Sequence, residues 1–247
     1  MPSTPTKSNT GVEELIPPTE RQISYSCDGR DLLGLLVLPD GDGLAPAVLL
    51  GHEGPGQSDP ERGVARRLAE LGYVAFARDY HGRGRRIQDR AEMFERLGVL
   101  MADTSLTRAI AQASLAELLA EPRVDPARVA AIGYCFGGTM ALELGRSGAP
   151  VAAIVGFHAG LASNSPGDAA NIRCPVLVCI GADDPIIPSE QRTAFENEMR
   201  DGGVDWQMHV YGDAQHTFTN PAASGAGIPG ISYDEAADRR SWAAMLT

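Results

Sequence analysis

Apolar runs and amphipathic stretches alternate along this chain from residue 20 to its end. Two of the runs, Val151–Phe157 and Pro175–Ile180, are apolar throughout, as central strands of a parallel sheet are. In the stretch that begins with Asp59, apolar residues recur instead at helical spacing, and Gly72 ends the pattern. The expected strands are 22–27, 32–38, 47–50, 73–77, 129–134, 151–157, 175–180 and 206–211, and the expected helices are 59–71, 89–101, 104–121, 138–145, 189–200 and 232–245.

This alternation predicts a single-domain α/β fold with a mostly parallel central sheet and helices on both faces. We expect the first two strands to form a hairpin. Residues 1–19 are rich in Pro, Thr and Ser, which favours a flexible tail before a domain at 20–247. The segment between Phe157 and Cys174 is too short for a separate cap domain, so residues 82–101 are the best candidate for a cover over a site.

Composition and charge narrow the class of protein. The chain has 247 residues, of which 43% are hydrophobic and 21% charged, as in ordinary globular proteins. A formal net charge of −11 repels phosphate backbones and anionic lipids, so we expect neither a nucleic acid nor a membrane partner. No apolar run approaches the roughly 20 residues that span a bilayer. The N-terminus lacks the basic start and apolar stretch of a secretory signal, which favours a cytoplasmic protein.

The cysteines and histidines indicate neither disulfides nor a metal. Without a secretory signal, the four cysteines are expected to stay reduced, and Cys174 and Cys179 to be core residues of one strand. No two histidines stand at metal-ligand spacing on one element, so no metal site is expected.

A nucleophile motif stands where an apolar strand meets a predicted helix, at Gly133-Tyr134-Cys135-Phe136-Gly137-Gly138. It matches the nucleophile-elbow pattern G-x-S-x-G with cysteine in place of serine. The sharp turn raises the central residue above the sheet, and the positive end of the helix dipole favours a thiolate there. We therefore predict Cys135 as nucleophile and the N–H of Phe136 as a donor to a developing oxyanion.

An acid and a base follow two later strands, at the carboxyl edge of the sheet where doubly wound folds place their sites. His216 comes after the last strand, and Asp184 lies in the loop Gly181–Pro185, with Asp183 as its competitor. The order nucleophile, acid, base is that of α/β-hydrolases. We expect His216 to take the thiol proton and Asp184 to orient its imidazole.

These motifs resemble those of the dienelactone hydrolase family. The resemblance covers residues from about Ile23 to the C-terminal helix, and its specific parts are 133–138, 181–185 and 216–221. It implies an α/β-hydrolase fold, a cysteine nucleophile and no cofactor, with a small ester or lactone as substrate. It also implies that Glu53 contacts the resting thiol and that the N–H of Gly54 is the second oxyanion donor.

The same resemblance suggests residues that bind the substrate. Arg83, with Arg85 and Arg86 as rivals, would bind a substrate carboxylate. Members of the family that act on dienelactones carry a second arginine four residues after the histidine, where this chain has Asn220. An amide offers no charged fork to a carboxylate, so the substrate need not be an anion. We expect Tyr134 and Asn220 to contact the substrate as well.

Several alternatives remain open. A general carboxylesterase or thioesterase acting on neutral acyl groups fits the same motifs, and so does a non-catalytic scaffold that senses oxidants through Cys135. The sequence does not decide between a monomer and a homodimer. Gly51–Ser58 approaches a phosphate-binding loop, but Gln57 replaces the lysine and Glu53 would repel phosphate, which disfavours nucleotide binding.

Overall fold

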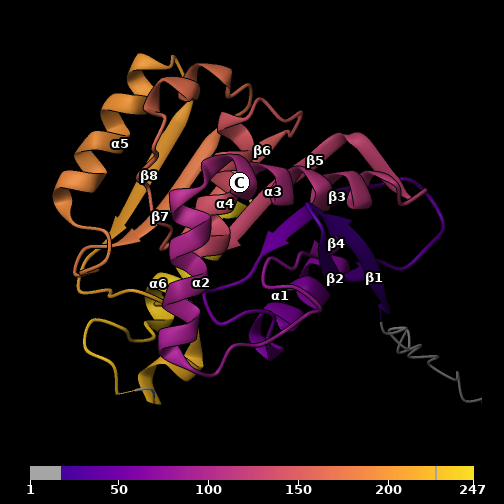
Figure 1. The fold of residues 1–247 in the computed structure, drawn as a ribbon, viewed down its shortest axis with the longest axis horizontal. Coiled ribbons are helices and arrows are strands. Elements are labelled where there is room, and N and C mark those ends of the chain that lie inside the picture. Colours follow the sequence, from indigo (N-terminus) through magenta and orange to yellow (C-terminus); the bar gives the residue numbers. More distant parts are fainter. Residues whose placement is uncertain (1–17, 226) are drawn as a thin grey trace, which may run out of the picture.

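Eight strands form one sheet in the computed structural model, which describes residues 18–225 and 227–247. The strand order is β1-β2-β4-β3-β5-β6-β7-β8 (Figure 1). The strands are β1 Thr19–Cys27, β2 Arg30–Leu38, β3 Ala45–Gly51, β4 Val74–Ala77, β5 Val124–Tyr134, β6 Ala153–Phe157, β7 Val176–Gly181 and β8 Trp206–Tyr211. The α-helices are α1 Asp59–Glu70, α2 Arg90–Ala102, α3 Thr104–Leu119, α4 Phe136–Arg146, α5 Ser189–Asp201 and α6 Glu235–Met245, and two short 3₁₀ helices, η1 Pro166–Asn171 and η2 Pro221–Gly225, complete the set.

Most of the sheet is parallel, which confirms the predicted fold class. The β1–β2 hairpin is antiparallel, and β2 also runs antiparallel to β4, with Leu36 opposite Phe76. All the remaining pairings, from β4 through β3 to β8, are parallel. The carboxyl ends of β3, β4, β5, β6, β7 and β8 therefore meet at one edge of the sheet.

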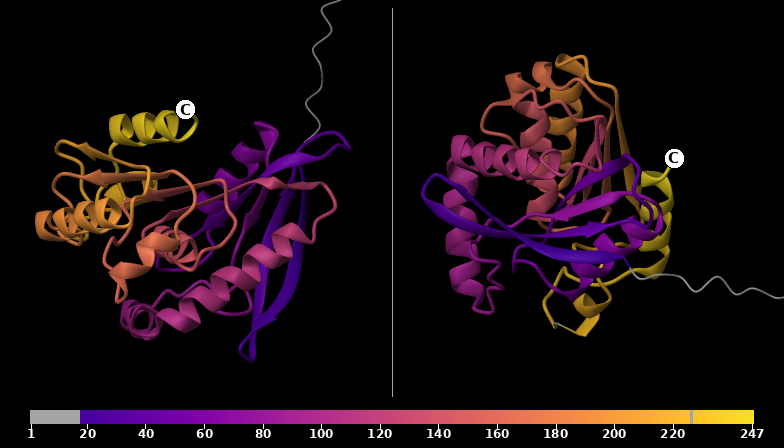
Figure 2. Two further views of the ribbon diagram at one scale, coloured as in Figure 1. Left: turned by 90° about the horizontal axis from the view of Figure 1, so that it is seen from above. Right: turned by 90° about the vertical axis from the view of Figure 1, so that its right-hand side faces the viewer.

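Helices cover both faces, as predicted (Figure 2). On one face α1 and α6 pack on the sheet through buried residues such as Leu68 and Trp242. On the other face α3, α4 and α5 enclose a larger core with Ile110, Met140 and Phe195. Each face of a central strand is thus buried against a helix, which explains why these strands have no polar face.

The structure corrects three boundary predictions. Thr19, placed in the tail by sequence, begins β1 and pairs with Leu38, whereas residues 1–17 lie outside the described residues. Strand β5 begins at Val124, five residues before the predicted start, because Val124 pairs with Ala45 ahead of the polar residues that follow it. Cys174 precedes β7 and is not part of that strand, although it is buried.

Helix α2 lies over the carboxyl edge, where a cover was expected from residues 82–101. Met93 and Leu97 on its inner face lie beside Gly54, which follows β3. Its outer face leaves Phe94 and Met101 about half exposed. Within 18–225 and 227–247, no helix has the length and apolarity needed to cross a lipid bilayer.

Candidate active site

Cys135 occupies a strained turn between β5 and α4. Its backbone lies in the left-handed region, with φ of 51° and ψ of −121°, a conformation that costs a non-glycine residue of order 1–3 kcal/mol. The turn is tight enough to require glycine beside it, because a Cβ on Gly133 would lie 2.2 Å from the carbonyl carbon of Gly137. Sequence and geometry thus agree that this turn raises residue 135 at the N-terminus of a helix.

Three predicted residues meet at this turn. The Nε2 of His216 lies 3.2 Å from the Sγ of Cys135, and its Nδ1 lies 2.7 Å from the Oδ2 of Asp184. His216 and Asp184 are buried, whereas the cysteine is half-buried. This geometry can move a proton from sulfur to imidazole and stabilise the imidazolium that results.

The charges of the neighbours favour the protonated imidazole. Burial by itself lowers the pKa of His216, but the Cys135 thiolate and the Asp184 carboxylate outweigh it and raise that pKa to about 10. A protonated His216 can therefore stabilise negative charge that develops on the sulfur of Cys135.

The contacts in the loop after β7 favour Asp184 over Asp183 as the carboxylate that orients His216. The Oδ1 of Asp184 accepts hydrogen bonds from the backbone N–H groups of Ile186 and Ile187, at 2.8 and 3.2 Å, which leaves Oδ2 for the imidazole. The competitor Asp183 is exposed. A carboxylate fixed by two backbone donors can hold a histidine ring in one orientation.

The N–H groups of Phe136 and Gly54 are the predicted hydrogen-bond donors to an oxyanion. Within residues 18–225 and 227–247 neither N–H has an acceptor. Two side chains hold the loop of Gly54 in place: the Tyr80 hydroxyl donates to the carbonyl of Glu53 at 2.7 Å, and the Nε2 of His81 donates to the carbonyl of Gly54 at 2.7 Å. Free donors on a fixed backbone are what a preorganised oxyanion hole needs.

Glu53 is placed otherwise than the sequence predicted. Its Oε2 accepts a hydrogen bond from the Nδ2 of Asn220 at 2.9 Å, and among the described residues no hydrogen bond joins it to the Cys135 thiol. Asn220 therefore holds this carboxyl group, and its contact with a substrate stays a prediction. Burial, reinforced by the neighbouring Glu61 carboxylate, raises the pKa of Glu53 to about 7.

His158 also lies at the site, although the sequence analysis favoured only His216 as the base. It follows β6, is fully buried, and lies edge-on against the ring of His216, with ring centroids 5.1 Å apart. Its Nε2 lies 2.8 Å from the hydroxyl of Thr219 and 3.9 Å from the Oε1 of Glu53. Burial, with the charge on His216, holds the pKa of His158 well below its ordinary value. Its position directly after an apolar strand was the signal that could have found it.

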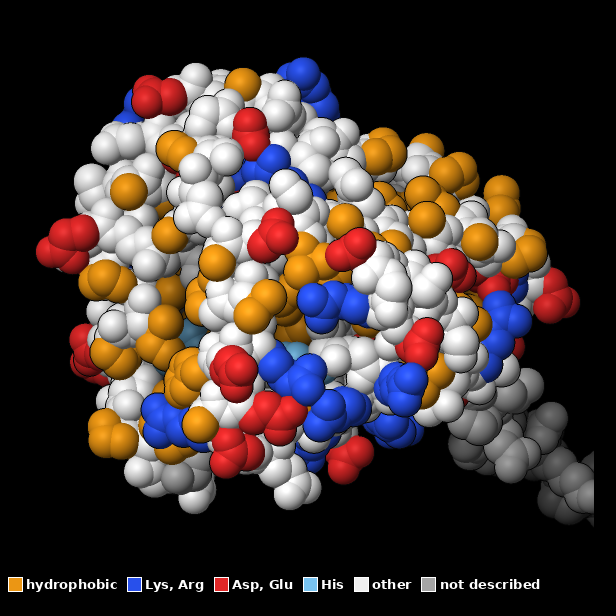
Figure 3. Space-filling view, in the orientation of Figure 1, with side chains coloured by type: hydrophobic (Ala, Val, Ile, Leu, Met, Phe, Trp, Pro, Cys, Tyr) orange, Lys and Arg blue, Asp and Glu red, His pale blue; other side chains and the backbone are white. Residues whose placement is uncertain are grey.

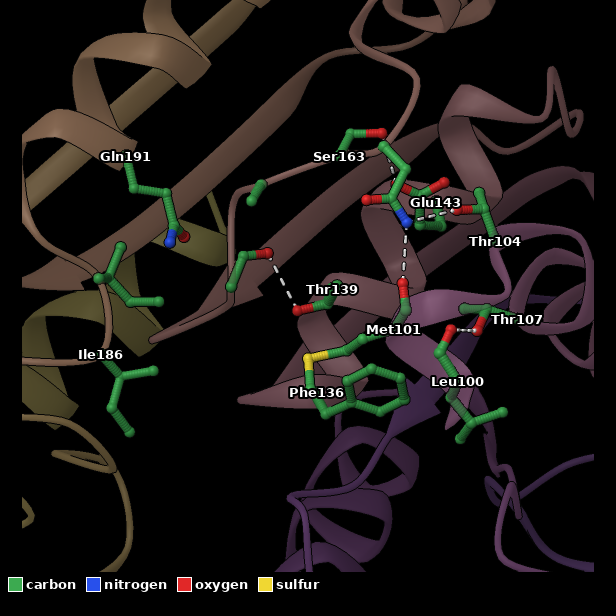
Figure 4. A pocket seen from close by; sticks show the side chains of 14 residues that line it. Leu100, Met101, Thr104, Thr107, Phe136, Thr139, Glu143, Ser163, Ile186 and Gln191 are labelled. Atoms are coloured by element: carbon green, nitrogen blue, oxygen red, sulfur yellow. Dashed lines mark hydrogen bonds between the residues drawn. The ribbon is translucent and has the colours of Figure 1, made fainter. Parts of the chain in front are cut away.

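A cavity of about 300 Å³ opens beside Phe136, the residue that follows Cys135 in the chain. Figure 4 shows Phe136, Met101 and Leu100 on one side and Ile186 and Gln191 on the other. In Figure 3 the corresponding face of the molecule is hollowed, and histidine surface is visible between apolar side chains. No arginine lines this cavity in the part of the chain that is described; its wall is formed by Leu100, Met101, Thr104, Thr107, Phe136, Thr139, Glu143, Gly160, Ala162, Ser163, Asn164, Ile186, Ile187 and Gln191.

Two residues predicted to bind substrate lie outside this cavity. Arg83 is at the surface, where its guanidinium pairs with Asp31 at 3.0 Å and both side chains are at least 70% exposed. Tyr134 is buried and stacks on Phe157, with centroids 4.7 Å apart, and borders a separate cavity of about 30 Å³ with Glu53. Neither side chain lines the cavity beside Phe136.

Among the described residues, no group of three or more His, Cys, Asp and Glu side chains has an arrangement that could hold a metal ion. His216 and Asp184 are already joined to each other and to Cys135. The chemistry available here is that of a thiol, an imidazole and backbone donors.

Comparison with known proteins gives the site its context. The profile of the Dienelactone hydrolase family matches residues 32–247. The chain is 27% identical over 233 residues to a putative carboxymethylenebutenolidase of Salmonella typhimurium, which covers 90% of this chain and 84% of that protein. It is also 27% identical over 213 residues to a probable 2-oxo-3-(5-oxofuran-2-ylidene)propanoate lactonase of Bradyrhizobium, covering 79% and 82%.

Two solved structures are more similar still. A protein named m3DLH is 46% identical, with a TM-score of 0.90 over 93% of this chain and 96% of that one. A dienelactone hydrolase-like promiscuous phosphotriesterase from metagenomic libraries is 43% identical, with a TM-score of 0.89 over the same shares. The family profile spans most of the chain, and the fold agrees over nearly its whole length. The chain therefore belongs to the dienelactone hydrolase family.

Proposed function

We propose that this protein hydrolyses small neutral esters or lactones through a thioester formed on Cys135. Membership of the family makes the chain an ester- or lactone-hydrolysing enzyme. The observation that carries the proposed mechanism is the continuous contact from the Cys135 sulfur through His216 to Asp184, at 3.2 and 2.7 Å. As a thiolate, the sulfur is the strongest nucleophile in that contact.

The acylation step uses all three side chains. His216 takes the thiol proton at Nε2, and the thiolate attacks the carbonyl carbon of the substrate. The carbonyl oxygen becomes an oxyanion that the N–H groups of Phe136 and Gly54 can bind, each such donor contributing about 3 kcal/mol. The tetrahedral intermediate then expels the alkoxide, which receives the proton from His216, and the acyl group remains on sulfur as a thioester.

The deacylation step repeats this chemistry with water. His216, now neutral, removes a proton from a water molecule, whose oxygen attacks the thioester carbonyl. The second oxyanion is bound by the same two donors, and its collapse releases the carboxylic acid and the Cys135 thiolate. Return of the proton from His216 to the sulfur restores the thiol and neutral imidazole with which the cycle began.

The cavity supports a neutral substrate over an anionic dienelactone. Its wall combines apolar side chains with neutral hydroxyl and amide groups, and its one charged member is the Glu143 carboxylate. A substrate carboxylate would find no cation on the described part of that wall, and the nearby Arg108 and Arg146 are already paired with Glu143, at 2.8 and 3.0 Å. Arg83, the expected carboxylate ligand, is instead paired with Asp31 at the surface. This favours the esterase alternative within the family.

Trapping the thioester tests the mechanism. Incubation with a p-nitrophenyl ester, rapid acid quenching and peptide mass spectrometry should locate the acyl group on Cys135. Cys135→Ala should remove nearly all turnover, whereas Cys27→Ala, a change at a half-buried thiol in β1, should leave it intact. Turnover that survives Cys135→Ala would refute the proposal. Rapid oxidation of Cys135 in a protein without esterase activity would support a redox-sensing role instead.

The charge of the substrate can be tested separately. Rates for a lactone or ester that carries a free carboxylate should be lower than rates for the methyl ester of the same compound. A strong preference for the free acid would overturn the assignment of a neutral substrate while leaving the thioester mechanism standing.

We also propose a cytoplasmic location. All four cysteines are unpaired, which fits a reducing compartment. Fractionation of the source cells with an antibody against the protein tests this, and recovery from the culture medium would contradict it.

A further inference from the structure

The cavity beside Phe136 contains several polar side chains, and most of them already have partners within the protein. Thr107 and Thr139 each donate their hydroxyl to a backbone carbonyl, at 2.6 and 3.0 Å. Ser163 donates to the Glu143 carboxylate at 3.0 Å. Groups committed in this way are poor recognition elements, because a ligand would have to displace an existing hydrogen bond.

The polar groups at the rim are also tied to one another. The Nδ2 of Asn164 donates to the carbonyl of Met101 at 2.9 Å and lies 3.2 Å from the Thr104 hydroxyl. These three residues also border a shallow open hollow beside α2, so they stand where the cavity meets solvent. Water can serve the remaining donor of Thr104 there.

Gln191 is different, because its acceptor is occupied and its donors are free. It lies in the first turn of α5 and extends into the cavity (Figure 4). Its Oε1 accepts a hydrogen bond from the backbone N–H of Leu161 at 2.7 Å. A backbone N–H can only donate, so this bond fixes which end of the amide is oxygen. Among the described residues the Nε2 group has no acceptor.

The wall around Gln191 is anchored to the acid loop. Ile186 and Ile187, its neighbours in the cavity, donate their backbone N–H groups to Asp184. The free amide donor is thus held on a rigid part of the structure, on the side of the cavity opposite Phe136 (Figure 4). A fixed free donor, among polar side chains that are already paired, discriminates between ligands that have an acceptor and ligands that lack one.

We propose that Gln191 is a specificity-determining residue whose Nε2 donates a hydrogen bond to an oxygen atom in the substrate, remote from the carbonyl that reacts. The preferred substrates are then neutral esters or lactones with an ether, ketone or hydroxyl oxygen in the chain that occupies this cavity. This inference rests on the proposed function and adds the substrate class to it. A carboxylate is a poorer acceptor here because no cation lines the described cavity wall, and Arg108 and Arg146 are already paired with Glu143.

Matched pairs of esters test the inference. One pair is p-nitrophenyl pentanoate and its analogue in which an ether oxygen replaces the methylene group next to the terminal methyl. A second pair carries the same replacement in the alcohol part, so that the two pairs identify which chain lies beside Gln191. Rates are compared for the wild-type protein, Gln191→Glu and Gln191→Leu.

Gln191→Glu is the decisive variant because it keeps the oxygen that accepts from Leu161 while it replaces the donor with an acceptor. For the ether ester of the responsive pair, kcat/KM should fall about fivefold to tenfold. The loss should appear in KM with kcat unchanged, since the contact exists equally in the ground and transition states. The alkyl ester of that pair should change by less than about twofold, and Gln191→Leu should give the same pattern.

Each result supports or overturns the proposed role of Gln191. Equal losses for the ether and alkyl esters would assign Gln191 a structural role, and no loss for any ester would exclude the contact; either outcome overturns the inference. Wild-type protein that hydrolyses none of the four esters would refute the proposed function itself, a failure that is visible without any variant.

Discussion

Glu53 provides a quantitative test of how this site is built. It is a buried carboxyl group that accepts one hydrogen bond, from Asn220, and its Oε1 has no hydrogen-bond partner among the described residues. The perturbation is Glu53→Gln, which keeps the size and the acceptor of the side chain and removes its ionisation. We expect this variant to be more stable than the wild-type protein at alkaline pH and nearly equal to it at acidic pH.

The sign and the magnitude follow from proton linkage. Burial, with the Glu61 carboxylate nearby, raises the pKa of Glu53 from its ordinary 4.5 to about 7. Between these values the folded protein holds a proton that the unfolded chain has lost, so the free energy of unfolding falls as the pH rises through this window. From about pH 5 to about pH 8 the loss amounts to about 2.5 kcal/mol. This is an upper value, because the side chain is 13% exposed and water can reach it.

The assay is urea denaturation of both proteins at several pH values across this window. The difference in unfolding free energy between Glu53→Gln and the wild-type protein should grow with pH and level off above the pKa of Glu53. Asp42→Asn, which removes an exposed carboxylate between β2 and β3, is the matched control and should show no such growth. Parallel curves for Glu53→Gln and wild type would refute the conclusion that this carboxyl group resists ionisation in the fold.

Three further predictions follow from the geometry. Asp184→Asn should lower kcat roughly a thousandfold or more, measured with a p-nitrophenyl ester, since the imidazole loses the carboxylate that orients it; a loss below tenfold would contradict that role. Gly133→Ala should lower the free energy of unfolding, measured by urea denaturation, by roughly 3 kcal/mol or more, because its Cβ would overlap the following helix. Gly63→Ala, with open space around it in α1, should raise that free energy by about 0.5–1 kcal/mol. Similar effects of the two substitutions would be inconsistent with the tight elbow. Arg83→Ala should change kcat/KM for a neutral ester by less than about twofold, because its ion pair with Asp31 is exposed; a large loss would bring Arg83 back as a substrate ligand.

Sequence patterns were most informative for residues whose positions are set by the end of a strand or by a tight turn. Cys135, Asp184 and His216 each stand just after a parallel strand. The carboxyl ends of such strands meet at one edge of the sheet, so the spacing of strands and loops was enough to predict that the three would lie close together. The glycines around Cys135 carried the same information about the turn.

These patterns could not predict which side chains contact one another. Glu53 bonds to Asn220, a residue 167 positions away in the sequence, and not to the nearby thiol. His158 joins the site because β6 and the loop after β8 bring it against His216. Arg83 pairs with Asp31 because the β1–β2 hairpin lies beside its loop. Each outcome depends on which distant group lies within a few ångströms.

By itself, then, the sequence determined the order of strands and helices, the elbow that raises Cys135, and the acid and base that follow later strands. Only the tertiary structure decided the partner of Glu53, the burial of His158 and the neutral cavity that leaves the amide of Gln191 free. The physical reason is that hydrophobic periodicity and turn chemistry act over a few neighbouring residues. Hydrogen-bond partners, desolvation and cavity walls are instead set by groups that only the packed chain brings together.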